Sequence, residues 1–210
     1  MKSRTWSLNT RFLHFGMVAT VTAQLFISVV MEEPGDDGGF IGNLAYQLHE
    51  LIGLTALGIV ALHWIWSLVS QSDGKLSHLF PWFGENRQRV KTEIKQAFYG
   101  DFPDSSKPGG LAGLIHGLGF LAVSGAAVTG MLIFLTFPAS GDPGLIGDIA
   151  EEMHEGMATL VWAYWLGHGS AAILHHLAGH DTLKQMFRFN NRYSPNDDTE
   201  NAGSNNVIKH

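Results

Sequence analysis

The sequence predicts an all-α protein, an integral membrane four-helix bundle with both termini in the cytoplasm. Only 15% of the 210 residues are charged, whereas about 25% is usual in soluble domains. Four long stretches carry no formal charge and are rich in Leu, Ile, Val, Phe and Trp. They lack the period-two alternation of membrane β-strands. All 13 Lys and Arg residues lie in only three segments of the chain, which indicates an oriented membrane protein.

Each of the four apolar stretches reaches the roughly 18–20 residues that cross a hydrocarbon core of about 30 Å. The predicted spans cover residues 11–31, 47–70, 110–137 and 153–178, approximately. The first span could instead be a signal peptide, but its apolar run exceeds the usual limit of about 15 residues and no small-residue cleavage site follows it. A retained helix is therefore expected. A soluble helical bundle, the other alternative, does not account for four charge-free spans.

The charged residues orient these spans. The Lys and Arg residues occupy the N-terminal tail, the connection between the second and third spans, and the C-terminal tail. The other two connections, Met31 to Tyr46 and Pro138 to Met153, contain no Lys or Arg and hold eight carboxylates. The positive-inside rule then places both termini inside and the two acidic connections outside. These carboxylates are Glu32, Glu33, Asp36, Asp37, Asp142, Asp148, Glu151 and Glu152.

One domain, residues 1–188, is expected to precede a polar and disordered tail at 189–210. The only long inner connection covers about residues 73–107, and its segment ENRQRVKTEIKQAF has the pattern of a short amphipathic helix on the inner membrane surface. A solvated surface helix is the alternative. Its apolar face would comprise Val90, Ile94, Ala97 and Phe98, and its basic face Arg87, Lys91 and Lys95.

The chain contains 11 His and no Cys. The lack of Cys excludes disulfides, iron–sulfur clusters, thiolate-ligated haem, c-type haem attachment and a cysteine nucleophile. Ionisable residues inside a membrane are costly and therefore indicate function. The histidines in the spans or at their ends are His14, His49, His63, His116, His154, His168, His175 and His176.

The spacing of these histidines predicts haem binding. His49 and His63 are 14 residues apart, and so are His154 and His168. In a helix, 14 residues cover about 21 Å and return to within about 40° of the same face. The second and fourth spans can therefore each direct two imidazoles into the bundle, one near each surface. Two histidines at one depth form a bis-imidazole site for haem iron, and two depths would hold two haems.

Roles without haem fit the pattern of histidines less well. A lone histidine is more simply a hydrogen-bonded interior residue, but the repeated spacing favours haem. A structural zinc site prefers Cys mixed with His at short spacing, which the chain lacks. Small residues lie near the histidines and permit either close helix contact or space for a flat macrocycle. They are Gly53, Gly109, Gly113, Gly117, Gly167 and Gly169.

Four segments in order resemble the prokaryotic cytochrome b561 family, which is related to the b-type cytochrome subunits of membrane hydrogenases. They are TRFLHFG, LHELIGLTALGIVALHWIW, GLIHGLGFLAVSGAAVTGML and MHEGMATLVWAYWLGHGSAAILHHLAGHDTLKQM, and the resemblance covers residues 8–187. It implies two haem b groups, the outer one held by His49 and His154 and the inner one by His14 and His168. The family often has Arg at the position of His63, so a pairing of His63 with His168 stays open.

The resemblance also implies a multi-pass protein of the bacterial inner membrane that transfers electrons between a quinone and a periplasmic redox partner. No catalytic side chain is expected. His116, His175 and His176 match family histidines that are not axial ligands. They would lie near the inner haem, where a quinone could dock, and could relay its proton.

The charges of the chain limit which binding partners are expected. Some family members oxidise superoxide, but eight outer carboxylates repel that anion and attract a basic protein such as a c-type cytochrome. The net charge of −6 argues against nucleic acid as a partner. Two alternatives from other classes are a haem-bearing membrane anchor of a larger oxidoreductase and a His-lined metal transporter, which would be colourless.

Overall fold

The structure is a computed structural model in which every regular element of the described chain is an α-helix. It describes residues 6–32, 39–71, 74–82, 84–99, 109–136, 144–177 and 186. The all-α prediction is confirmed for these residues. The helices are α1 (Leu8–Ile27), α2 (Gly39–Val69), α3 (Leu76–Leu79), α4 (Gly84–Phe98), α5 (Gly110–Thr136) and α6 (Gly144–Leu177). The tail predicted at 189–210 lies outside the described residues.

The long helices α1, α2, α5 and α6 overlap the four predicted spans but have different ends. α2 begins at Gly39 and α6 at Gly144, well before the predicted starts near 47 and 153. The helical hydrogen-bond pattern therefore continues into the acidic connections, where the charge pattern marked an end. Charged residues mark where the chain is expected to leave the apolar core of the membrane, and a helix can continue past that point.

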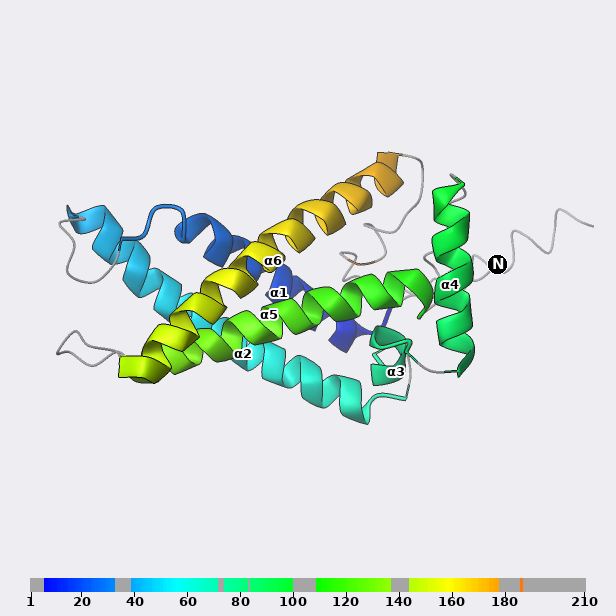
Figure 1. Ribbon diagram of the computed structural model, residues 1–210, viewed down its shortest axis with the longest axis horizontal. Helices are drawn as coiled ribbons and strands as arrows, with labels where there is room; N and C mark the ends of the chain where they lie inside the picture. The colour runs from blue at the N-terminus through cyan, green and yellow to red at the C-terminus, as the bar shows by residue number, and fades with distance from the viewer. Residues whose placement is uncertain are drawn as a thin grey trace, which may run out of the picture.

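α5 lies in the middle of the molecule and contacts α2, α3, α4 and α6, while α1 packs against α2. The long helices alternate in direction (Figure 1). As a result, the start of α1, the end of α2, the start of α5 and the end of α6 lie at the same end of the molecule as α3 and α4 (Figure 1). The starts of α2 and α6, next to the predicted acidic connections, lie at the opposite end.

Two helices, α2 and α5, are long and apolar enough to cross a membrane by length and composition. Only 17% of the most apolar window of α2 and 22% of that of α5 is buried inside the structure. A core helix of a soluble protein would be buried around most of its circumference. These two helices instead expose apolar side chains, as contact with lipid requires. α1 and α6 carry more polar residues, and four spans stay a prediction.

The interior joins the four long helices through a small apolar cluster and three indole hydrogen bonds. The cluster consists of Leu25, Val60, Phe120, Val123 and Val161. The indole nitrogens donate across helix pairs, which stabilises close packing where hydrophobic burial between helices is small. The bonds are Trp66 to Thr10 Oγ1 (3.1 Å, α2 to α1), Trp64 to Ser124 Oγ (3.1 Å, α2 to α5) and Trp165 to Thr22 Oγ1 (3.0 Å, α6 to α1).

The glycine row at the start of α5 serves close backbone contact. A Cβ at Gly113 would overlap the carbonyl oxygen of His78, and one at Gly117 would overlap that of Leu79. Both carbonyls belong to α3, so α5 and α3 touch through their backbones. At these two positions the structure shows close helix packing and not space for a macrocycle.

The inner connection contains the predicted amphipathic helix, α4. On its predicted apolar face Val90 is buried within the protein, whereas Ile94 is 36% exposed and Phe98 is 87% exposed, so contact of this face with the membrane stays a prediction. Glu93, a charged residue, is also buried. The reason is a specific polar contact: its carboxylate accepts a hydrogen bond from the Leu111 backbone N–H (2.6 Å) at the start of α5.

Candidate functional site

Two of the predicted histidines meet at the end of the molecule where α2 and α6 begin. The ring centroids of His49 in α2 and His154 in α6 are 6.2 Å apart, with ring planes at 85°. If each metal–nitrogen bond is about 2 Å long, two imidazoles on opposite sides of one iron have centroids about 6 Å apart. The separation of His49 and His154 therefore fits a bis-imidazole iron site.

α5 orients the His154 ring. Nδ1 of His154 lies 3.0 Å from the Ala126 carbonyl oxygen and 3.1 Å from Thr129 Oγ1. A carbonyl oxygen only accepts hydrogen bonds, so Nδ1 carries the proton and Nε2 keeps its lone pair. Metal-binding histidines usually have such a contact at the second nitrogen, which fixes the tautomer and the ring orientation. The protonation of His154 is therefore the one that a metal ligand needs.

The other histidine of the pair, His49, is held by α1 at its backbone. Gln24 Nε2 donates to the His49 carbonyl oxygen at 2.8 Å, and it passes directly over Gly53, where a Cβ would lie 2.7 Å from that nitrogen. The Nδ1 atom of His49 is buried without a hydrogen-bond partner among the described residues. Nothing in this part of the chain fixes the tautomer of His49, whereas a bond from one ring nitrogen to a metal would do so.

Four more histidines gather toward the end that holds α3 and α4, one from each long helix. They are His14 in α1, His63 in α2, His116 in α5 and His168 in α6. His63, His116 and His168 each lie within electrostatic range of His14. The ring centroids of His116 and His168 are 4.8 Å apart. This is less than the roughly 6 Å that an iron between two imidazoles requires.

The partner of His168 stays a prediction. The ring of His63 packs on Phe120, with centroids 4.6 Å apart, and its Nδ1 lies 3.3 Å from Ser67 Oγ. His116 donates from Nδ1 to the Ala112 carbonyl oxygen at 2.6 Å. Both histidines also lie within electrostatic range of His14, and none of these contacts is with His14. These contacts do not distinguish His14 from His63 as an iron ligand.

Two residues that contact the histidines were not predicted from the sequence. Tyr164 stacks on His168, with ring centroids 5.2 Å apart and ring planes at 5°. A Cβ at Gly119 would overlap the Tyr164 ring, so this glycine provides the space for it. Tyr164 precedes His168 by four residues, and that helical spacing could have revealed it. Thr129 comes from another helix than His154, and sequence spacing carries no information about such a contact.

The remaining candidates lie in the last turn of α6. The side chain of His176 is exposed, and the side chain of His175 lies outside the described part of the structure.

Within the described part of the chain, no group of three or more His, Cys, Asp or Glu side chains could hold a bare metal ion. The pair of imidazoles from His49 and His154 suits an iron whose other four ligands come from a macrocycle.

The chain matches a known protein family. The family model described as prokaryotic cytochrome b561 matches residues 5–189, a range that includes all six helices. The predicted resemblance is thereby confirmed. Comparisons with curated proteins and with solved structures gave no significant match.

Proposed function

The chain belongs to the prokaryotic cytochrome b561 family, and we propose that it transfers electrons across a bacterial inner membrane between a quinone and a periplasmic redox protein. Membership of the family makes it a membrane b-type cytochrome that binds haem b and takes part in electron transfer. The proposal adds the number of haems, their ligands, the orientation of the chain and its redox partners.

The observation that carries the proposal is the pair formed by His49 and His154. Their 6.2 Å centroid separation and the proton fixed on His154 Nδ1 suit two axial ligands of one haem. Haem b held at this site would supply a one-electron redox centre. The chain itself orients the His154 ring through Ala126 and Thr129, and Gln24 holds the backbone of His49.

A second haem b, in this proposal, is held by His168 together with His14, or with His63 in its place. The 14-residue step along α2 and α6 supports a second level about 21 Å from the first. His116 lies against His168, and His175 and His176 follow at the end of α6. A quinone takes up protons when it is reduced, and imidazoles exchange protons near neutral pH. These three histidines are therefore the proposed proton relay at a quinone site.

The acidic end supports a basic periplasmic partner. Asp148 and Glu152 are exposed on the first turns of α6, and the two connections at this end carry no Lys or Arg. Such a surface attracts a basic protein such as a c-type cytochrome and repels superoxide. Electron transfer to or from a c-type cytochrome is therefore proposed ahead of superoxide oxidation. A haem-bearing anchor for a catalytic subunit is the alternative outside this class.

A haem count and a reduced-minus-oxidised spectrum of the purified chain test the ligands. Two haem b groups per chain are expected, and His49→Ala or His154→Ala should each remove one. His78→Ala is the matched control, because His78 lies in α3 and is not a proposed ligand. A wild-type chain with fewer than two haems, or an H154A variant with both, would overturn the proposed set. His14→Ala and His63→Ala are then compared, and the variant that loses the second haem identifies the inner ligand.

The partner is tested by rapid mixing of the reduced protein with a basic c-type cytochrome. Fast oxidation that slows as salt is added is expected, because screening weakens the attraction between the charged surfaces. Asp148→Asn with Glu152→Gln should slow the reaction at low salt. Rapid superoxide consumption together with no reaction with the c-type cytochrome would contradict the choice of partner. A catalytic subunit that co-purifies with the chain would favour the anchor alternative.

A further inference from the structure

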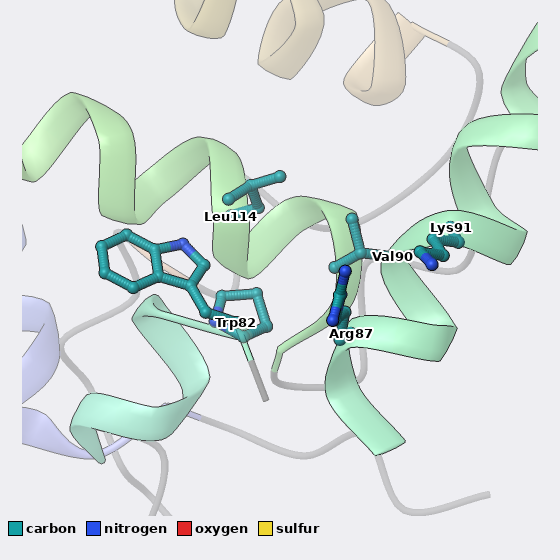
Figure 2. Close-up of a pocket in the computed structure, with 6 residues that line it drawn as sticks. Trp82, Arg87, Val90, Lys91 and Leu114 are labelled. Carbon is teal, nitrogen blue, oxygen red and sulfur yellow. The ribbon is translucent and has the colours of Figure 1, made fainter. Parts of the chain in front are cut away.

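A pocket of about 340 Å³ lies at the end of the molecule remote from His49 and His154, where α4 crosses the start of α5 (Figure 2). Its lining consists of Pro81, Trp82, Arg87, Val90, Lys91 and Leu114. Arg87, Val90 and Lys91 come from α4, Leu114 comes from α5, and Trp82 comes from the segment that follows α3 (Figure 2). No histidine of the proposed redox sites belongs to this lining.

The lining combines an apolar floor with two available cations. Val90 is buried, and the indole of Trp82 is 49% exposed at the edge of the pocket. Arg87 and Lys91 are four residues apart, so they lie on one face of α4 and both are exposed. Neither forms an ion pair within the described residues, in contrast to Arg89, which pairs with Glu93.

The pocket lies where an interface between lipid and water is expected. It adjoins the start of α5, one of the two helices apolar enough to cross a membrane. Beyond it, α4 ends at Phe98 and Tyr99 follows, and their side chains are 87% and 90% exposed. Exposed aromatic side chains next to basic residues are typical of helices at the membrane surface. The described Lys and Arg residues of α4, which are Arg87, Arg89, Lys91 and Lys95, lie on this side as well.

We propose that this pocket binds an anionic phospholipid of the inner leaflet, with its phosphodiester held by Arg87 and Lys91. Arginine can donate two parallel hydrogen bonds to a phosphate, and lysine adds a compact positive charge. Trp82, Val90 and Leu114 contact the glycerol and the first methylene groups of the lipid. A free phosphate ion would gain nothing from these apolar side chains, so the apolar floor favours an amphiphile over a soluble anion.

Lipid titration of the detergent-solubilised full-length chain, followed by native mass spectrometry, tests the proposal. The probes are dioctanoylphosphatidylglycerol, dioctanoylphosphatidylcholine and inorganic phosphate. Phosphatidylglycerol is expected to bind clearly more tightly than phosphatidylcholine, which has the same chains and no net charge. Each basic residue contributes about fivefold to binding of an anionic lipid surface, so R87Q/K91Q should weaken phosphatidylglycerol binding roughly 20-fold.

Lys95→Gln is the matched control. Lys95 follows Lys91 by one turn of the same helix and is exposed, but it does not line the pocket. K95Q should therefore keep its affinity within about twofold, whereas Trp82→Leu, which keeps both cations, should also weaken binding. Circular dichroism of each variant confirms that the helices are retained.

Three results would overturn the proposed lipid site. They are equal binding of the two lipids, displacement of phosphatidylglycerol by an equal concentration of inorganic phosphate, and a loss in K95Q as large as that in R87Q/K91Q. The haem count of the same samples is a separate readout. Failure of the lipid site therefore leaves the proposed electron transfer standing, and a chain without two haems can still show the lipid site.

Discussion

The proton on His154 links the packing of α5 to the chemistry proposed for the outer site. Nδ1 of His154 donates toward both the Ala126 carbonyl oxygen and Thr129 Oγ1. The Thr129 hydroxyl hydrogen is directed to the Gly125 carbonyl oxygen at 2.8 Å, so its oxygen is able to accept. A ligand imidazole that donates two such bonds gives more electron density to its metal and stabilises the more oxidised state.

Thr129→Val should therefore raise the reduction potential of the outer haem. Valine has nearly the shape of threonine but no acceptor for His154. A difference of about 0.5–1 kcal/mol between the two oxidation states corresponds to roughly 20–40 mV for one electron. A spectroscopic redox titration of the purified variant measures the shift. Thr136→Val is the control, because among the described residues the Thr136 hydroxyl bonds only to backbone oxygens of its own helix. A lowered or unchanged potential in T129V would contradict the role of Thr129.

Gly119→Ala should disturb the inner group of histidines. The added Cβ would overlap the Tyr164 ring, so the ring must leave its stack on His168. Overpacking of this kind costs about 1–3 kcal/mol of stability. Thermal unfolding followed by circular dichroism should show that loss, and the spectrum of the inner haem should change while that of the outer one does not. Gly58→Ala is the control, since a Cβ there has no neighbour within 4 Å. Equal stability of G119A and G58A would refute the packing argument.

At the scale of elements, Glu93 joins α4 to α5. Its carboxylate accepts hydrogen bonds from the Leu111 N–H and from Arg89 Nε. A negative charge at the start of a helix also stabilises the unpaired N–H groups of its first turn. The chain turns into α5 through Gly109 and Gly110, whose φ angles of 85° and 64° favour glycine. α4 is therefore held against α5 by a polar contact and not by a broad apolar face.

Glu93→Gln should loosen α4 without removing haem. The substitution removes the charge that pairs with Arg89 and faces the start of α5. Hydrogen bonds to a buried charged group contribute about 1.5–3 kcal/mol, so amide hydrogen exchange in α4 should become roughly 10–100-fold faster. Hydrogen exchange with mass spectrometry measures this effect. Glu85→Gln makes the same charge change in the first turn of α4, where the side chain is exposed, and should leave the exchange of the α4–α5 junction unchanged. Unaltered protection of the α4 amides in E93Q would contradict the role of Glu93 in joining α4 to α5.

The sequence was sufficient for the long helices but not for the contacts of α4. Charge-free apolar runs predicted α1, α2, α5 and α6 because burial in lipid leaves a strong compositional pattern. The ends at Gly39 and Gly144 were missed, because a helix can continue through charged residues beyond an apolar core. The burial of Glu93 was missed, because periodicity assumes that apolar residues are the ones buried. Glu93 is buried through a partner in another helix, and periodicity does not report such partners.

For the candidate site, the 14-residue spacing of the histidines predicted which side chains come near each other. His49 and His154 meet as expected, because a fixed helical repeat converts sequence distance into depth and direction. The contacts that hold these two histidines were not predictable in this way. Ala126 and Thr129 reach the His154 ring from α5, and Gln24 reaches the backbone of His49 from α1. Their positions depend on how the helices pack.

At the scale of the whole molecule, the alternating helices separate two kinds of surface. The starts of α2 and α6, next to the acidic connections in the sequence, lie at one end, and α3 and the basic helix α4 lie at the other (Figure 1). The pair of His49 and His154 lies near the acidic end, and the group around His168 lies toward the basic end. An electron that enters at one end can therefore leave at the other only by crossing the apolar middle of the molecule.

This separation predicts which residues a reagent reaches from outside the cell. The chain has no Cys, so a single introduced cysteine is the only thiol in each variant. Ser77 in α3 and Asp148 in α6 are both exposed and lie at opposite ends of the molecule. The positive-inside rule places Asp148 outside and Ser77 inside. In spheroplasts, a membrane-impermeant maleimide should label Asp148→Cys at once and Ser77→Cys only after lysis, while the Cys-free parent chain reports background. Labelling of S77C in intact spheroplasts with protection of D148C would reverse the orientation, and with it the assignment of His49 and His154 to the periplasmic side.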